Sequence, residues 1–129
     1  MNNSFKPEGY NSLSPYLIVD DAKRLVQLLR AVFHAEEQRS FIDEQGRIVH
    51  LELRIDDSVL MISNSTPDYP ANKLMLHLYV PEVLRTFELA EKNGCEVIER
   101  PIQQEGDPDM RGSFYDCAGN YWAVSTQME

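Results

Sequence analysis

The sequence is poor in cysteine and in basic residues, and it contains no long apolar run. Its two cysteines, Cys95 and Cys117, are not in a CxxC spacing, which argues against a disulfide or zinc framework and predicts two free thiols. The sequence has only 12 Lys and Arg residues but 21 Asp and Glu residues. The resulting formal net charge of −9 would repel nucleic-acid phosphates and anionic lipids. We therefore expect neither nucleic acid nor a membrane as a partner.

Membrane-spanning and secretory segments are also missing from the pattern. No stretch approaches the roughly eighteen apolar residues that a transmembrane helix needs. The first nine residues lack the apolar centre of a secretion signal, so we expect a cytoplasmic protein. The polar start of the chain is broken by Pro7 and Gly9, which predicts a flexible N-terminal arm over residues 1–11.

Residues 12–129 have the length and composition of a single globular domain, since the chain is 43% hydrophobic and 26% charged. A chain of this length buries about two-thirds of the surface of its extended form, so it can fold without a metal or a disulfide. Apolar alternation predicts strands at 12–19, 39–43, 47–55 and 59–63, and helical spacing predicts a helix at 21–34. Pro67 and Pro70 predict a surface linker at 64–72.

The second half of the chain repeats this order. Strands are predicted at 73–80, 95–99, 111–117 and 121–127, and a helix is predicted from Pro81, at its first position, to Gly94. Val19 aligns with Val80 at an offset of 61 residues (19 to 80). A repeat of this length is a whole strand–helix–strand–strand–strand (βαβββ) unit. The sequence thus predicts an α+β fold of two tandem βαβββ modules, 12–63 and 73–127, that form a curved mixed sheet around a concave pocket, with the helices on the outer face.

Four segments carry a family resemblance that spans nearly the whole chain: SPYLIVDDAKRLVQLLRAVF, GRIVHLELRIDDSVLMISN, LMLHLYVPEVLRTFELAEKNG and FYDCAGNYWAVST. They resemble the phosphonate-operon-associated branch of the glyoxalase/bleomycin-resistance/extradiol-dioxygenase superfamily, also called the vicinal oxygen chelate superfamily. The resemblance implies the two-module fold and a homodimer, in which modules are often exchanged between chains. It does not fix the reaction, because members include metal-dependent isomerases, dioxygenases, thiol transferases and metal-free drug-binding proteins.

The metal-dependent members of this superfamily place His or Glu ligands at four positions, which align here with Ser14, Met61, Met75 and Ala123. None of these side chains suits divalent nickel, zinc, magnesium or iron. The resemblance therefore implies that the usual metal site is missing, and we expect no cofactor. His50 and Glu52 share one strand face, and together with His77 they could instead form a displaced two-histidine-one-carboxylate site for a divalent metal.

Two other interpretations of these residues stay open. A histidine beside a carboxylate titrates near neutral pH, so His50 with Glu52 could act as a general acid or base. Alternatively, Glu52 forms an ion pair with Arg54 or Arg111, and His50 and His77 only hydrogen-bond within a polar pocket wall.

Aromatic and thioether side chains recur at the predicted pocket positions: Tyr16, Met61, Met75, Tyr79, Tyr115 and Tyr121. Such a lining suits a flat or apolar organic ligand, although the same residues could fill a dimer interface or a core. Trp122 has the opposite strand parity and is expected to pack under a helix. The leading hypothesis is a small-molecule-binding protein without the usual metal site. The alternative is a glyoxalase-like lyase or isomerase, or a dioxygenase-related enzyme, that uses His50, Glu52 and His77.

Overall fold

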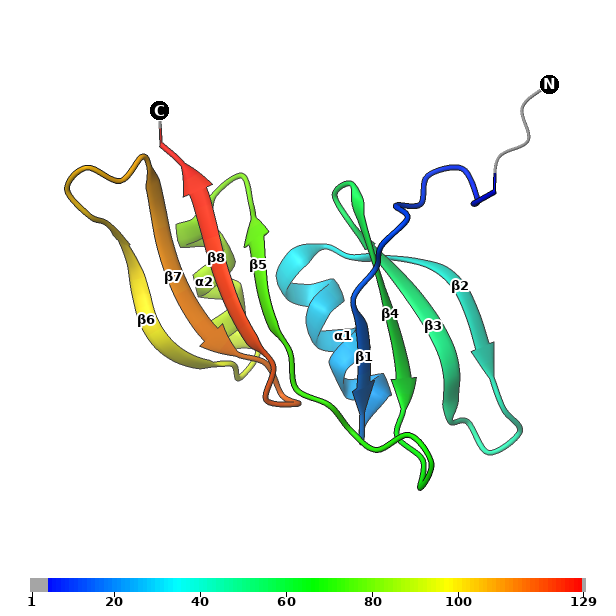
Figure 1. Cartoon of the computed structure of the whole chain (residues 1–129). Helices are drawn as coiled ribbons and strands as arrows, with labels where there is room; N and C mark the ends of the chain where they lie inside the picture. The colour runs from blue at the N-terminus through cyan, green and yellow to red at the C-terminus, as the bar shows by residue number, and fades with distance from the viewer. Residues whose placement is uncertain (1–4, 129) are drawn as a thin grey trace.

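The structure is a computed structural model that describes residues 5–128, and these residues form two modules of the predicted βαβββ order (Figure 1). The first module consists of β1 (Tyr16–Val19), α1 (Ala22–Phe33), β2 (Glu36–Ile42), β3 (Ile48–Ile55) and β4 (Ser58–Asn64). The second consists of β5 (Met75–Tyr79), α2 (Val83–Lys92), β6 (Glu96–Gln103), β7 (Asp109–Tyr115) and β8 (Tyr121–Gln127). Residues 1–4 of the predicted arm, and residue 129, lie outside the described residues.

Each module forms its own four-stranded sheet. Sheet A has the strand order β1-β4-β3-β2, and sheet B has the equivalent order β5-β8-β7-β6. In both sheets the first strand pairs in parallel with the last strand of the module, and the other pairings are antiparallel. The shared topology confirms the internal repeat and the predicted α+β fold class.

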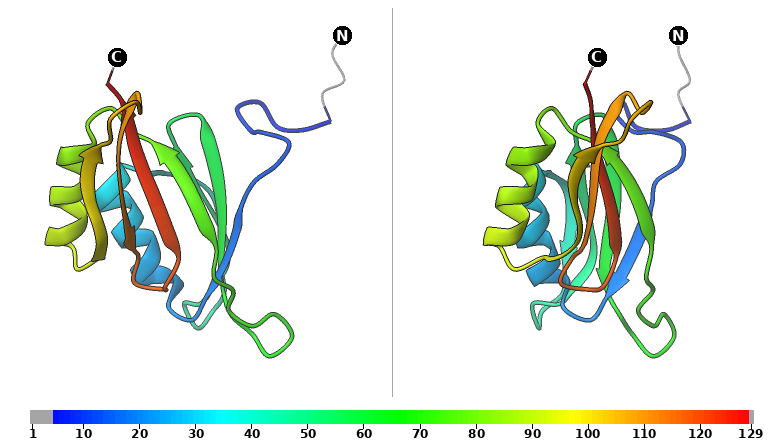
Figure 2. Two further views of the ribbon diagram at one scale, coloured as in Figure 1. Left: turned by 60° about the vertical axis from the view of Figure 1, so that its left-hand side comes forward. Right: turned by 90° about the vertical axis from the view of Figure 1, so that its left-hand side faces the viewer.

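Both helices lie on the same side of the two sheets, as predicted, so no helix covers the opposite face of either sheet, which we call its open face (Figure 2). Helix α1 begins where the Asp21 carboxylate accepts a hydrogen bond from the backbone N–H of Arg24. The prediction that Pro81 is the first residue of the second helix is wrong, because α2 begins two residues later. There the backbone N–H of Val83 donates to the hydroxyl of Thr126 on β8, which satisfies one of the free amides of the first turn.

An aromatic cluster joins the two modules beneath the sheets. The ring of Phe33, the last residue of α1, lies 4.8 Å from that of Trp122 and 6.2 Å from that of Phe114, both in sheet B. Phe87 of α2 contacts Phe114 edge-on at 5.2 Å between centroids. Trp122 is only 2% exposed, which confirms its predicted packing under the helices. Because large aromatic side chains each contribute about 1.5–3 kcal/mol on burial, this cluster fixes the modules to one another.

Several strands differ from their predicted bounds: β1 begins at Tyr16 and not at 12, β2 spans Glu36–Ile42 and not 39–43, and β5 spans Met75–Tyr79 and not 73–80. The differences in β6 and β7 have local causes. β6 continues to Gln103, past the predicted end at 99, because an irregularity in its register lets Ile102 pair with Arg111 even though Pro101 lacks an N–H. β7 ends at Tyr115, since Asp116 starts a turn in which its carboxylate accepts from the backbone N–H groups of residues 118 and 120.

Two smaller expectations can also be compared with the structure. Both Cys95 and Cys117 are free, as predicted. Within residues 5–128, neither α1 nor α2 has the length and apolar character that crossing a membrane would require.

Candidate functional site

The open faces of the two sheets carry most of the predicted site residues. Across sheet A, Tyr16 on β1 lies opposite Met61 on β4, and Met61 lies opposite Glu52 on β3. The equivalent row of sheet B consists of Met75, Tyr121 and Tyr115. Strand alternation therefore directs these six side chains to the sides of the sheets that the helices do not cover.

Glu52 is the buried centre of a hydrogen-bond chain on sheet A. It is 4% exposed, and one of its carboxylate oxygens accepts a hydrogen bond from the phenol of Tyr10 in the N-terminal segment. Its other oxygen lies 2.8 Å from Nε2 of His50, and Nδ1 of His50 lies 3.1 Å from the hydroxyl of Tyr16. Four side chains from three separate segments are thus connected in the order Tyr10, Glu52, His50 and Tyr16.

The electrostatics of this chain favour an ionised Glu52. Burial alone would raise the pKa of Glu52, but the hydrogen bonds from Tyr10 and His50 outweigh it and hold that pKa below its ordinary value. The same contact acts in the opposite sense on Tyr10, because hydrogen bonding to the carboxylate raises the pKa of its phenol. Glu52 is therefore a carboxylate at neutral pH, and it can only accept hydrogen bonds.

The prediction that Glu52 forms an ion pair with Arg54 or Arg111 is wrong. Arg54 donates instead to the backbone carbonyl of Gly9, and Arg111 lies 2.7 Å from a carboxylate oxygen of Asp107. The contact of Arg54 was not predictable, because it depends on the path of the N-terminal segment over the sheet, whereas Arg111 and Asp107 are only four residues apart. The guanidinium of Arg39 on β2 also lies over the ring of Tyr10 in that segment, at 5.2 Å. The flexibility of the arm stays a prediction.

His77 is not part of this hydrogen-bond chain. It lies on β5 in sheet B, where its Nε2 is 3.1 Å from the hydroxyl of Ser125. In the part of the chain that the structure describes, no three His, Cys, Asp or Glu side chains are close enough to hold a metal ion together. His50 and Glu52 are therefore brought together, and His77 is not placed with them.

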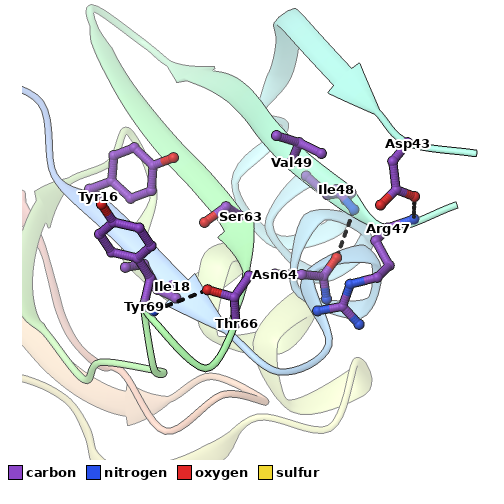
Figure 3. Close-up of a pocket in the computed structure, with 10 residues that line it drawn as sticks. All are labelled: Tyr16, Ile18, Asp43, Arg47, Ile48, Val49, Ser63, Asn64, Thr66 and Tyr69. Atoms are coloured by element: carbon purple, nitrogen blue, oxygen red, sulfur yellow. Dashed lines mark hydrogen bonds between the residues drawn. The ribbon is translucent and has the colours of Figure 1, made fainter. Parts of the chain in front are cut away.

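A cavity of about 510 Å³ opens beside the Tyr16 end of the hydrogen-bond chain (Figure 3). Its apolar and aromatic walls are Tyr16, Ile18, Ile48, Val49 and Tyr69. Its polar groups come from Asp43, Arg47, Ser63, Asn64 and Thr66. Figure 3 shows the rings of Tyr16 and Tyr69 on the same side of the cavity.

The linker between the modules forms part of this cavity wall. Thr66 and Tyr69 exchange two backbone hydrogen bonds of 2.9 and 3.1 Å, which closes a tight turn and presents the Tyr69 side chain. Next to the turn, the carboxamide of Asn64 accepts from the backbone N–H of Ile48 at 2.7 Å. Tyr69 was not predicted as a site residue, because the composition of 64–72 indicates a surface linker, although an aromatic residue among small polar ones was a usable signal.

Of the six predicted ligand-binding residues, only Tyr16 lines this cavity. Met61 is its neighbour in sheet A, and the other four lie on sheet B. Met75 is 77% exposed there, and the hydroxyl of Tyr79 donates to Asp109 at 2.7 Å. Tyr115 and Tyr121 contact each other edge-on, at 6.0 Å between ring centroids.

Comparison with known sequences finds relatives of unassigned activity. No family model matches the chain. An uncharacterised protein of Mycobacterium bovis is 27% identical over 124 residues, which cover 88% of this chain and 81% of that protein. An uncharacterised protein of Mycobacterium tuberculosis is also 27% identical, over 88% of this chain and 72% of its own length.

Comparison with solved structures establishes the fold. TioX from Micromonospora sp. ML1 is similar with a TM-score of 0.77 and 16% identity, over 91% of this chain and 98% of TioX. The fosfomycin resistance protein FosX from Listeria monocytogenes has a TM-score of 0.70 and 20% identity, over 88% and 91% of the two chains. A glyoxalase/bleomycin resistance protein/dioxygenase family enzyme from Burkholderia phytofirmans has a TM-score of 0.67 and 15% identity, over 87% and 94%. The chain therefore has the glyoxalase/bleomycin-resistance fold.

Proposed function

We propose that this chain is a small-molecule-binding protein that holds a flat, largely apolar organic ligand in the cavity of sheet A. The observation that carries the proposal is the cavity itself, whose volume of about 510 Å³ lies within the usual range for ligand pockets. Tyr16 and Tyr69 offer ring faces for stacking, and Ile18 and Val49 add apolar contact. Hydroxyl, amide and guanidinium groups around them would orient the polar end of the ligand.

We further propose that binding does not require a metal, because the four positions that align with the ligands of metal-dependent glyoxalase-like proteins hold Ser14, Met61, Met75 and Ala123. Magnesium prefers oxygen ligands, and zinc, nickel and iron also bind imidazole. Of the four side chains, only Ser14 offers such a group, its hydroxyl. The likeness to the phosphonate-operon-associated branch and the cytoplasmic location stay predictions.

A homodimer is part of the same proposal. Large apolar side chains such as Phe41 of β2 and Met75 of β5 are mostly exposed on the sheets, and a second copy of the chain would cover such surface. Light scattering coupled to size-exclusion chromatography would measure the mass, and a monomer at micromolar concentration would contradict this part.

The ligand proposal is tested by a thermal-shift screen of flat aromatic acids and phenols, followed by calorimetric titration of any compound that stabilises the protein. Tyr69→Ala should weaken binding by roughly two- to tenfold, because loss of one stacking ring costs on the order of 0.5–1.5 kcal/mol. Tyr115→Ala is the matched control, since Tyr115 lies on sheet B outside the cavity. Equal losses in both variants, or no compound that stabilises the protein, would contradict the proposal.

A second candidate, a glyoxalase-like lyase or isomerase, is favoured by the 2.8 Å contact between His50 and Glu52. The enzyme hypothesis from the sequence used His50, Glu52 and His77, and the contact supports only the pair of His50 and Glu52, since His77 lies in the other sheet. His50→Ala would then abolish turnover with little change in melting temperature, whereas a loss of folding would assign His50 a structural role.

A further inference from the structure

The hydrogen-bond chain of sheet A ends in the ligand cavity. Tyr16 is the member of the chain that lines the cavity, and it is 38% exposed. Glu52, at the other end of the contact with His50, is almost fully buried. The hydrogen bonds thus connect the Glu52 carboxylate, which is shielded from water, through the imidazole of His50 to the phenol of Tyr16, which a bound molecule can contact.

The carboxylate determines which nitrogen of His50 carries the proton. Ionised Glu52 only accepts hydrogen bonds, so Nε2 of His50, at 2.8 Å, is the protonated nitrogen of the neutral ring. Nδ1 then offers a lone pair to the hydroxyl of Tyr16, 3.1 Å away. The phenol of Tyr10 donates a hydrogen bond to the second carboxylate oxygen of Glu52, and this contact orients Glu52 towards His50. This is the relation of acid, imidazole and hydroxyl that activates a hydroxyl group in hydrolases of other folds.

We propose that Tyr16, His50 and Glu52 form a proton-transfer site in which Tyr16 is the catalytic residue, and His50 and Glu52 are positioning residues. The inference rests on the cavity of the proposed function and adds an activity to it. The substrate class is a flat organic molecule with an acidic hydroxyl, or with a C–H group next to a carbonyl.

The proton transfer balances without a co-reactant. The O–H or C–H bond of the substrate breaks, and its proton passes to the Tyr16 oxygen while the proton of Tyr16 passes to Nδ1 of His50. The electron pair stays on the substrate as an alkoxide or enolate, and the imidazolium is stabilised by the Glu52 carboxylate. Return of the proton to a neighbouring atom of the enolate completes an isomerisation, and neither an oxidant nor a reductant is consumed.

Tyr69 provides an internal control in the same cavity. It is 68% exposed, more than Tyr16, and its backbone N–H contacts Thr66. Among residues 5–128, no carboxylate or imidazole contacts the Tyr69 phenol. Exposure alone therefore predicts that Tyr69 reacts faster than Tyr16, and activation by His50 predicts the opposite order.

Benzenesulfonyl fluoride tests this order in the full chain without any knowledge of the substrate. In the reaction the phenol oxygen bonds to sulfur, the S–F bond breaks, fluoride leaves, and the phenol proton passes to His50. Peptide mass spectrometry would follow modification of Tyr16 and Tyr69 in the same sample. We expect Tyr16 to react about tenfold faster or more, a modest fraction of the usual effect of a general base.

Two variants separate activation from structure. His50→Gln should slow Tyr16 about tenfold and leave Tyr69 unchanged, and added imidazole should restore Tyr16 modification in His50→Ala. Tyr16 modification that is slower than that of Tyr69 in the wild type, or equal slowing of both tyrosines in His50→Gln, would overturn the inference. Failure of imidazole rescue in a folded His50→Ala variant would also count against it. None of these results depends on ligand titration, so a failure here is distinguishable from a failure of the ligand proposal.

Discussion

Replacement of Phe33 by alanine should destabilise the core strongly. Phe33 is buried, and its ring packs on Trp122 and Phe114 of the other module. Truncation of a buried phenylalanine costs about 3–5 kcal/mol. Total stabilities of single domains are about 5–15 kcal/mol, so the variant should lose a large part of its stability. At roughly 4 °C per kcal/mol, the melting temperature should fall by about 12–20 °C.

Urea unfolding, followed by two independent probes, would measure the loss in the free energy of unfolding of Phe33→Ala. Trp122 is the one tryptophan of the chain, so its fluorescence reports directly on the contact between the modules. Far-ultraviolet circular dichroism reports on both sheets and helices, and coincident transitions would show that the modules unfold together. Leu84→Ala is the control, because Leu84 is 59% exposed on α2 and its loss should cost less than about 1 kcal/mol. A loss below about 1 kcal/mol for Phe33→Ala, or an equal loss for both variants, would refute the role of this cluster.

Three further predictions follow from buried polar groups and close packing. Asp116→Ala should cost about 3 kcal/mol or more in urea unfolding, because its carboxylate accepts from the indole N–H of Trp122 at 2.9 Å and from neighbouring amides. The lowered pKa of Glu52 contributes stability above about pH 5 that is lost as the pH falls through the folded-state pKa, so Glu52→Gln should flatten stability against pH in the acid range. An unchanged acid slope would contradict this. Gly112→Ala should destabilise by about 1–3 kcal/mol, since an added Cβ would lie 2.6 Å from the Phe87 ring and 2.8 Å from the backbone oxygen of Glu99. A neutral result in urea unfolding would contradict this close packing.

The fold was predictable because each module repeats local patterns. Alternation marked the strands, and the offset between Val19 and Val80 revealed the duplication. The continuation of β6 past Pro101 was not predictable, because it depends on a register irregularity opposite β7. Such irregularities are properties of a strand pair, and a single strand carries no local signal of them.

The candidate site was predictable only in part. The shared face of His50 and Glu52 follows from their spacing on one strand, and their contact agrees with it. The contact with Tyr16 depends on the pairing of β1 with β4, and the contact with Tyr10 depends on the path of a segment outside the sheets. Tyr69 belongs to a turn between the modules, and the periodicity of the sequence does not predict that this turn lies beside the cavity. The site was not fully predictable because its contacts depend on which distant segments pair with one another, and the chemistry of the individual residues does not specify that pairing.

The position of Tyr10 has a practical consequence for the production of the protein. A purification tag or fusion partner attached ahead of residue 1 would be joined nine residues before Tyr10 (1 to 10), whose phenol donates a hydrogen bond to Glu52. The opposite end of the chain follows β8, at the side of the molecule away from β2 and β3 (Figure 1). Recombinant material for assays of the site is therefore best tagged at the carboxyl end, with an untagged sample as the reference.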